Sequence, residues 1–191
     1  SGLLVFTKNQ KAAGILSKQI QDGNANKDYI ALCSGVLEEK SGNLTHYIKK
    51  DSVTKQAKVV NTEEFAKDQE LIRGQKADRN SMEKECESSS YKKAVLTYEV
   101  EKEFEDSSII KVHLQTGRFH QIRAQFSFIG NALLGDMKYG DVKSRELSMK
   151  KRINKIALCA YHLTLKHPIT GKEMDFVLDK KYLPEWYKFN Q

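Results

Sequence analysis

The stretch of sequence that decides the fold is TGRFHQIRAQFSFIG, residues 116–130. Four apolar side chains in it recur at helical spacing: Phe119, Ile122, Phe126 and Ile129. This spacing predicts a helix with one buried stripe. Thr116 is suited to be its N-cap, and Gly130 stands where a helix commonly ends. We therefore expect a short amphipathic helix whose apolar side faces the core.

The flanks of this helix are polar and free of acids. They carry Arg118, His120, Gln121, Arg123 and Gln125, and no acidic residue occurs from 111 to 125. Such an edge suits contacts to the phosphates and bases of a nucleic acid. Two arginines alone would more often be solvated charges, and a lone histidine would more often be a surface residue. Their concentration in one helix favours nucleic-acid binding.

Outward from this helix, the patterns indicate mostly strands. Residues 9–21 predict a short amphipathic helix, and residues 27–34 a strand with Tyr29, Ala31 and Cys33 on one side. A weaker strand covers 45–49, and two hairpins follow, 92–104 with 109–114 and 157–165 with 173–178. We expect one α+β domain over residues 1–191, with a central, mainly antiparallel mixed sheet flanked by helices and crossed by a substrate cleft.

The charge is uneven along the chain. The 191 residues carry a formal net charge of +7, but residues 62–90 have a local net charge of −3, which leaves +10 on the rest. This surplus suits a polyanionic partner. Residues 61–90 are also poor in apolar side chains and end in three serines, so we expect an acidic, exposed and partly helical insertion there.

Composition also limits the cellular setting. The three cysteines lie more than fifty residues apart, which predicts neither a disulfide framework nor a zinc knuckle. His113, His162 and His167, with Cys159, lack zinc spacing, so we assign them to core or hairpin packing and expect no metal. No apolar run approaches the ~20 residues of a membrane span. We expect a cytoplasmic protein without membrane contact.

Four segments resemble the motifs of RluA-type pseudouridine synthases. Residues 116–140, TGRFHQIRAQFSFIGNALLGDMKYG, resemble the family signature Thr-Gly-Arg-x-His-Gln-Ile-Arg followed by Gly-x-x-x-x-Gly-Asp-x-x-Tyr-Gly. SGLLVFTKNQKAA at 1–13, KDYIALCSG at 27–35 and ALCAYHLTLKHPITGKEMDF at 157–176 resemble three further motifs in the same order. The resemblance covers nearly the whole chain except residues 61–90.

The resemblance implies an RNA pseudouridine synthase that isomerises uridines in rRNA or tRNA without a cofactor. We expect it to be a monomer. It implies that Arg123 pairs with a catalytic Asp and that Tyr29 stacks on the flipped uracil. Taken alone, Tyr29 would more often be a core-facing aromatic. Further residues are expected to contact RNA or to shape the cleft: Lys27, Arg118, His120, Gln121 and Lys138.

One residue of the family pattern is missing. The catalytic Asp of the family stands in Arg-Leu-Asp-x-x-Thr-Ser-Gly-Leu, four positions before the serine that Ser1 matches, and this sequence contains no counterpart. Asp22 does not match the motif, and we interpret Asp136 as a turn residue. We therefore expect that the chain lacks the N-terminal portion of its catalytic domain and that the nucleophile lies upstream of Ser1.

Two other functions remain open at this point. The chain could be a catalytically inactive RNA-binding module of the same fold, which has lost the Asp naturally. It could also be a basic hydrolase or ribosomal factor that uses His120, which the residues favour least. An Arg-Leu-Asp-x-x-Thr segment upstream in the parent reading frame would separate the first function from the second.

Overall fold

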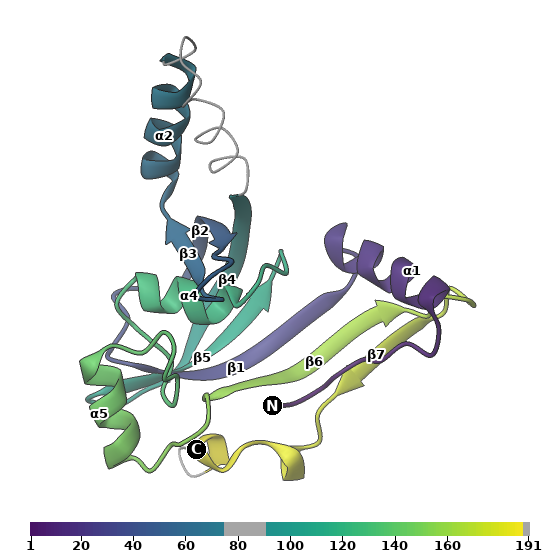
Figure 1. Cartoon of the computed structure of the whole chain (residues 1–191). Helices are drawn as coiled ribbons and strands as arrows, with labels where there is room; N and C mark the ends of the chain where they lie inside the picture. The colour runs from purple at the N-terminus through teal and green to yellow at the C-terminus, as the bar shows by residue number, and fades with distance from the viewer. Residues whose placement is uncertain (75–90, 189–191) are drawn as a thin grey trace.

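A seven-stranded antiparallel sheet forms the centre of the computed structural model, which describes residues 1–74 and 91–188 (Figure 1). The strand order is β3-β2-β4-β5-β1-β6-β7. The strands are β1 (Asn26–Ser34), β2 (Ser41–Lys50), β3 (Ala57–Val60), β4 (Lys92–Glu103), β5 (Ser107–Leu114), β6 (Leu158–Lys166) and β7 (Glu173–Val177). The helices of the described part are α1 (Gln10–Gln21), α2 (Thr62–Gly74), α4 (Gln121–Phe128), α5 (Val142–Lys150) and α6 (Glu185–Lys188), with a 3-10 turn at Lys180–Tyr182.

The α+β fold, the first helix and both hairpins agree with the expectation from the sequence. α1 begins after Asn9, whose side chain accepts a hydrogen bond from the N–H of Ala12. β4 pairs with β5, and β6 pairs with β7. The sheet contains no parallel pair of named strands in the described part, and its parallel element is an isolated bridge between Gly2 and Ala160.

The two faces of the sheet bury different cores. On β1, Ala31 and Cys33 point to the face that α4 covers, where Ile122 and Phe126 pack against them. The alternate residues of the strand point to the opposite face, because successive side chains of a strand alternate. That second core receives Leu147 of α5. Because neighbouring side chains of β1 point to opposite faces, α4 and α5 cover opposite faces of the sheet (Figure 1).

The helix α1 lies over the β6–β7 end of the sheet, on the same side as the loop that leads into α4. Leu16 of α1 packs with Ala25 and Leu165. A Cβ atom built on Gly117 would lie 3.6 Å from Cγ2 of Ile20 in α1. The loop before α4 therefore lies against the C-terminal end of α1.

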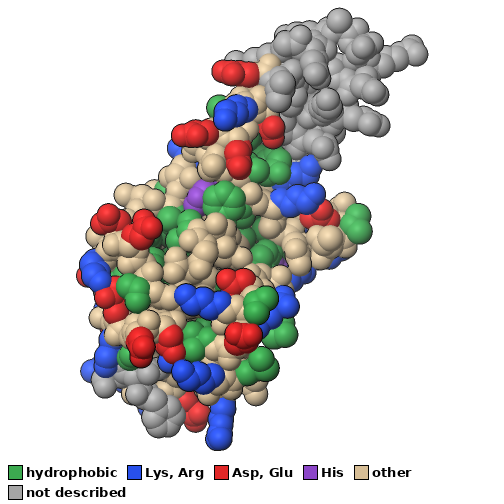
Figure 2. All heavy atoms as spheres, turned by 90° about the vertical axis from the view of Figure 1, so that its left-hand side faces the viewer, with side chains coloured by type: hydrophobic (Ala, Val, Ile, Leu, Met, Phe, Trp, Pro, Cys, Tyr) green, Lys and Arg blue, Asp and Glu red, His purple; other side chains and the backbone are tan. Residues whose placement is uncertain are grey.

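The helix α2 stands away from the sheet as an arm (Figure 1). Phe65 holds its base, since its ring stacks on Tyr47 of β2 at 3.8 Å between centroids. Glu63 and Glu64 lie in the first turn. In Figure 2 acidic side chains stand along the arm, and acidic and basic ones are mixed on the surface below it. The first part of the expected insertion is thus helical up to residue 74, residues 75–90 lie outside the described part, and the insertion over 61–90 stays a prediction.

In the part of the chain that the structure describes, no helix has the length and apolar character needed to cross a membrane.

Candidate active site

The strand β1 presents Lys27 and Tyr29 toward the α1 side of the sheet. Both side chains line a cavity of about 210 Å³, whose other walls come from α1, β6 and the N-terminal residues 3–5. The cavity is mostly apolar, and burial raises the pKa of the Tyr29 phenol and lowers the pKa of the Lys27 ammonium. A β-bulge between Asp28 and Tyr29 shifts the register in which β1 pairs with β6 at this point. The geometry offers an aromatic ring and a partly desolvated cation in one pocket.

The helix α4 begins later than the sequence pattern predicts. It starts at Gln121, and His120 precedes it with φ of 52° in the left-handed region. A non-glycine residue rarely adopts this conformation, which costs on the order of 1 kcal/mol. Ile122 and Phe126 are buried as predicted, but Phe119 is 37% exposed and does not belong to the buried stripe. The predicted start was wrong because hydrogen bonds in the preceding loop outweigh the apolar spacing.

Thr116 is part of those hydrogen bonds and does not cap the helix. Its hydroxyl accepts the N–H of Val95 at 2.8 Å and donates to Oε1 of Gln121 at 2.9 Å. The same Oε1 accepts the N–H of Arg118, and Nε2 of Gln121 donates to the carbonyl of Val95. Gln121 is 3% exposed. Its amide holds the loop in place from inside, so the part of the expectation that this geometry supports is that Gln121 shapes the cleft.

Arg123 forms a bidentate ion pair with Asp136. Nε and Nη2 donate to the two carboxylate oxygens at 2.6 and 2.8 Å, and the Asp136 side chain is fully buried. Asp136 also accepts the backbone N–H groups of Lys138 and Tyr139. Burial alone would raise the pKa of Asp136, but the Arg123 and backbone hydrogen bonds outweigh it and lower the pKa. Asp136 is therefore a turn residue, as expected, and also the carboxylate partner of Arg123, which the sequence analysis did not foresee.

Tyr139 connects this ion pair to His120. Its hydroxyl accepts the N–H of Ala57 in β3 at 2.6 Å and lies 3.0 Å from Nδ1 of His120, and its ring lies 4.8 Å from the Arg123 guanidinium. Burial, together with the positive charges of Arg123 and Lys138, lowers the pKa of His120. The lowered pKa favours the neutral imidazole, in which Nδ1 can accept the Tyr139 hydrogen bond.

The expected site residues form two groups on one side of the sheet. Lys27 and Tyr29 share the pocket. The second group is the 136–139 turn, which contains Lys138, together with His120 and Arg123 beside it. The loop before α4 links the two groups, since a Cβ on Gly117 would lie 3.7 Å from Nζ of Lys27. Arg118 belongs to this loop, and its Nε donates to the carbonyl of Lys93. The roles assigned to these residues stay predictions.

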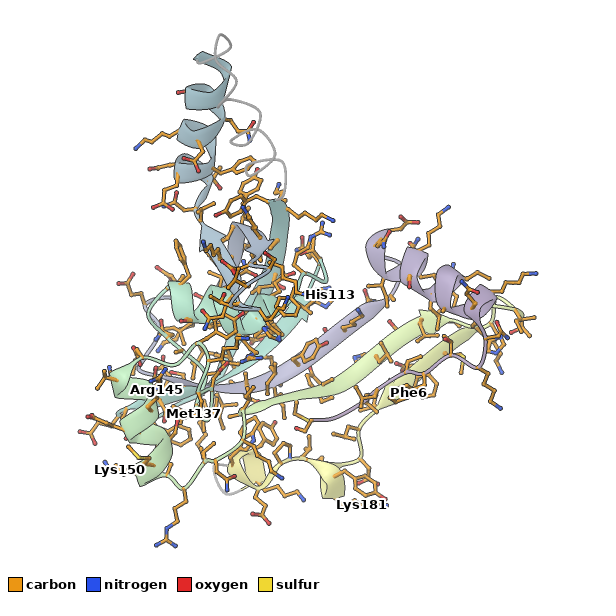
Figure 3. All side chains as sticks on the ribbon, in the orientation of Figure 1. Phe6, His113, Met137, Arg145, Lys150 and Lys181 are labelled. Atoms are coloured by element: carbon orange, nitrogen blue, oxygen red, sulfur yellow. The ribbon has the colours of Figure 1, made fainter. Side chains whose placement is uncertain are left out.

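Two histidines lie within hydrogen-bond distance of Asp28, although the sequence analysis assigned them to packing. Asp28 lies 2.6 Å from Nδ1 of His113 and 2.9 Å from Nδ1 of His162, and Nε2 of His162 lies 2.7 Å from Asp175. His113 stands near the C-terminal end of β5 (Figure 3), and its side chain is 41% exposed. Among the described residues no group of three or more ligands is arranged for a metal ion. His167, as expected, belongs to the β6–β7 turn.

His162 should make stability depend on pH. The hydrogen bond to Asp175, opposed by burial and aided by Asp28, raises its pKa. A raised folded-state pKa means that the stabilisation is complete below the unfolded value of about 6.5 and is lost as the pH rises through the folded value. We expect the urea midpoint to fall between about pH 6 and 8 more steeply in the wild type than in His162→Gln. Parallel pH profiles for the two proteins would contradict this.

The fold itself is shared with known structures. Human RNA Pseudouridylate Synthase Domain Containing 1 superposes with a TM-score of 0.63 at 22% sequence identity, over 93% of this chain and 63% of that one. Human RNA Pseudouridylate Synthase Domain Containing 4 gives a TM-score of 0.61 at 19% identity. The chain therefore has the pseudouridine synthase fold.

The sequence comparisons define the family. The profile of the family described as RNA pseudouridylate synthase matches residues 1–128. Ribosomal large subunit pseudouridine synthase D of Zymomonas mobilis is 31% identical over 92% of this chain, and tRNA pseudouridine synthase C of Haemophilus ducreyi is 27% identical over 95%. The chain belongs to the RluA-type RNA pseudouridine synthase family. It spans 48% of the Zymomonas protein and 70% of the Haemophilus protein.

Proposed function

We propose that this chain is the main part of the catalytic domain of an RNA pseudouridine synthase, which isomerises specific uridines of rRNA or tRNA. In this reaction the N1–C1′ glycosidic bond breaks, the uracil turns, and C5 bonds to C1′; C5 then loses its hydrogen as a proton, and N1 gains a proton. The observation that carries the proposal is the pocket that pairs the Tyr29 ring with Lys27, beside the loop of the family signature. A flat aromatic ring can stack on an extruded base, and an apolar pocket can retain the detached uracil.

Arg123 is proposed to orient the catalytic carboxylate. Its Nε and Nη2 bind Asp136, and Nη1 has no hydrogen-bond partner among the described residues. A second carboxylate at Nη1 would be held ionised by a charge-assisted hydrogen bond. Asp136 itself is fully buried and saturated by hydrogen bonds, which makes it a poor nucleophile.

We further propose that the nucleophilic Asp comes from residues upstream of Ser1. The segment at Ser1 runs parallel to β6, because the Ser1 amine donates to the carbonyl of Leu158 and the N–H of Ala160 donates to Ser1. A segment ahead of Ser1, continued in the same direction, would run beside residues 155–157 of the chain.

That path leads toward Arg123. The turn that carries Asp136 lies directly against Lys155, since a Cβ on Gly135 would collide with the carbonyl oxygen of Lys155. Asp136 in turn holds Arg123. An Asp a few residues before Ser1 would therefore enter the neighbourhood of the guanidinium, which supports the assignment of the missing carboxylate.

RNA binding should be dominated by phosphate contacts. Because the chain outside 62–90 carries a net charge of +10, we expect the affinity for RNA to fall steeply between about 50 and 200 mM salt. Arg118→Ala should weaken binding and lower the slope of log K against log salt by about one. Lys150→Ala is the control, because it also removes one exposed positive charge, but at the end of α5 beside Asp106 and away from the 136–139 turn (Figure 3). Salt-independent binding would contradict the prediction.

The function is tested with the full-length parent protein on rRNA and tRNA transcripts, by chemical mapping of pseudouridine. We expect modification of one or a few uridines in one of the two RNA classes. The free, buried Cys33 and Cys159 suit a reducing cytoplasm, and we propose that a monomer acts there. Salt-dependent RNA binding without any pseudouridine would instead support the inactive RNA-binding module.

A further inference from the structure

Phe119 is an aromatic side chain that the fold turns outward. The apolar spacing of the sequence would bury it with Ile122 and Phe126, yet it is 37% exposed because α4 begins only at Gln121. The left-handed backbone at His120 produces this turn. A strained backbone conformation persists only where many surrounding contacts hold it in place. Such conformations are common at ligand-binding sites.

The Phe119 ring is held in place together with that of His120. The two rings stack at 3.9 Å between centroids with 26° between their planes. Nδ1 of His120 is hydrogen-bonded to the Tyr139 hydroxyl, and the buried Gln121 accepts the N–H of Arg118 just before Phe119. Side chains and backbone on both sides of the pair are therefore fixed, and the pair is preorganised.

Positive charge surrounds this pair. The ammonium of Lys50 lies 4.7 Å from the centroid of the Phe119 ring. The ion pair of Arg123 with Asp136 has no net charge, so the positive surplus near His120 comes from Lys138 and Lys50. Exposed aromatic rings within a positive surface are the elements that bind single-stranded nucleic acids.

We propose that Phe119 and His120 form a stacking platform for an RNA base next to the reacting uridine, while Lys50 and Lys138 meet the adjoining phosphates. This inference rests on the proposed function and adds a recognition site to it. On binding, the flexible Lys50 ammonium moves from the ring to a phosphate, and a base takes its place. Stacking tolerates any base, because every base has a π face.

The platform would receive a neighbouring base and not the uridine itself. Gly117, two residues before Phe119, lies against Lys27 at the rim of the Tyr29 pocket. The loop thus reaches from the pocket to the platform. A strand whose target base enters the pocket can place an adjacent base on the platform.

The test uses single-stranded RNA that carries the fluorescent base 2-aminopurine at successive positions around one uridine, with the 191-residue chain. We expect the wild type to quench one position beside the uridine by stacking. Phe119→Leu should abolish this quenching and weaken binding about tenfold or more. Phe119→Trp should retain both, which shows that the loop still folds when the residue changes. Phe176→Leu, which alters another exposed phenylalanine on β7, should leave both unchanged.

The salt dependence separates stacking from charge. Phe119→Leu should leave the slope of log K against log salt unchanged, whereas Lys50→Gln should lower it by about one. The proposal would be overturned if Phe119→Leu kept the quenching and the RNA affinity of the wild type. It would also be overturned if Phe119→Trp lost as much quenching and affinity as Phe119→Leu. These readouts need no turnover, so a parent protein that forms no pseudouridine would refute the proposed function and not the platform.

Discussion

A protein that carries an Arg-Leu-Asp-x-x-Thr segment ahead of Ser1 is expected to form pseudouridine, whereas the 191 residues by themselves form none. Arg123 and Tyr29 can orient a uridine, but neither supplies a carboxylate nucleophile. Removal of the nucleophile from a covalent enzyme lowers the rate by roughly a millionfold. The measurement is tritium release from RNA labelled at C5 of uridine, because C5 loses its hydrogen when it bonds to C1′.

Two variants of the extended protein complete this experiment. Replacement of the added Asp by Asn should abolish tritium release, and Arg123→Ala should lower it by orders of magnitude, because it leaves the carboxylate unpaired and misoriented. RNA affinity is measured in parallel, so that loss of binding is distinguished from loss of chemistry. Turnover by the unextended chain would refute the account of the nucleophile, and full turnover by Arg123→Ala would refute the role of Arg123.

The substitution Asp136→Ala should destabilise the protein by about 3 kcal/mol or more. It leaves the Arg123 guanidinium, 14% exposed, without its bidentate partner, and it removes the acceptor for the N–H groups of Lys138 and Tyr139. The free energy of unfolding is measured by urea denaturation at pH 7, where the lowered pKa of Asp136 keeps the carboxylate charged in the folded state.

Asp141→Ala is the matched control for this measurement. Asp141 caps α5 by accepting the N–H of Ser144, and loss of such a cap costs about 1 kcal/mol. In the double variant Arg123→Met with Asp136→Ala, the loss should be smaller than the sum of the two single losses, because neither charge is left unpaired. Equal losses for Asp136→Ala and Asp141→Ala would show that the ion pair adds nothing.

The sequence predicted best where one local pattern determines one element. The alternation of Tyr29, Ala31 and Cys33 placed a strand at 27–34, and the hairpins followed from similar patterns. The short strand β3 and the helix α5 were not predicted. β3 has four residues, and α5 buries only one large apolar side chain, Leu147, so neither carries a strong periodicity.

The site could be predicted only in part, because its geometry depends on contacts between distant segments. Family motifs pointed to Tyr29, Arg123 and the residues near them. The pairing of Arg123 with Asp136 and the burial of Gln121 depend on tertiary hydrogen bonds that no spacing reveals. One signal was available: the i, i+3 spacing of Asp136 and Tyr139 in the signature places both on one turn, and both contact the Arg123 side chain.

The turn at 136–139 contacts both the strand that supports the arm and the residues of the site. Tyr139 bonds to Ala57 of β3 and to His120, and β3 pairs with β2, which carries the base of α2 through the stacked Tyr47 and Phe65 rings. The base of the arm and the start of α4 are therefore connected by one continuous series of contacts, which runs through two strands and the phenol of Tyr139.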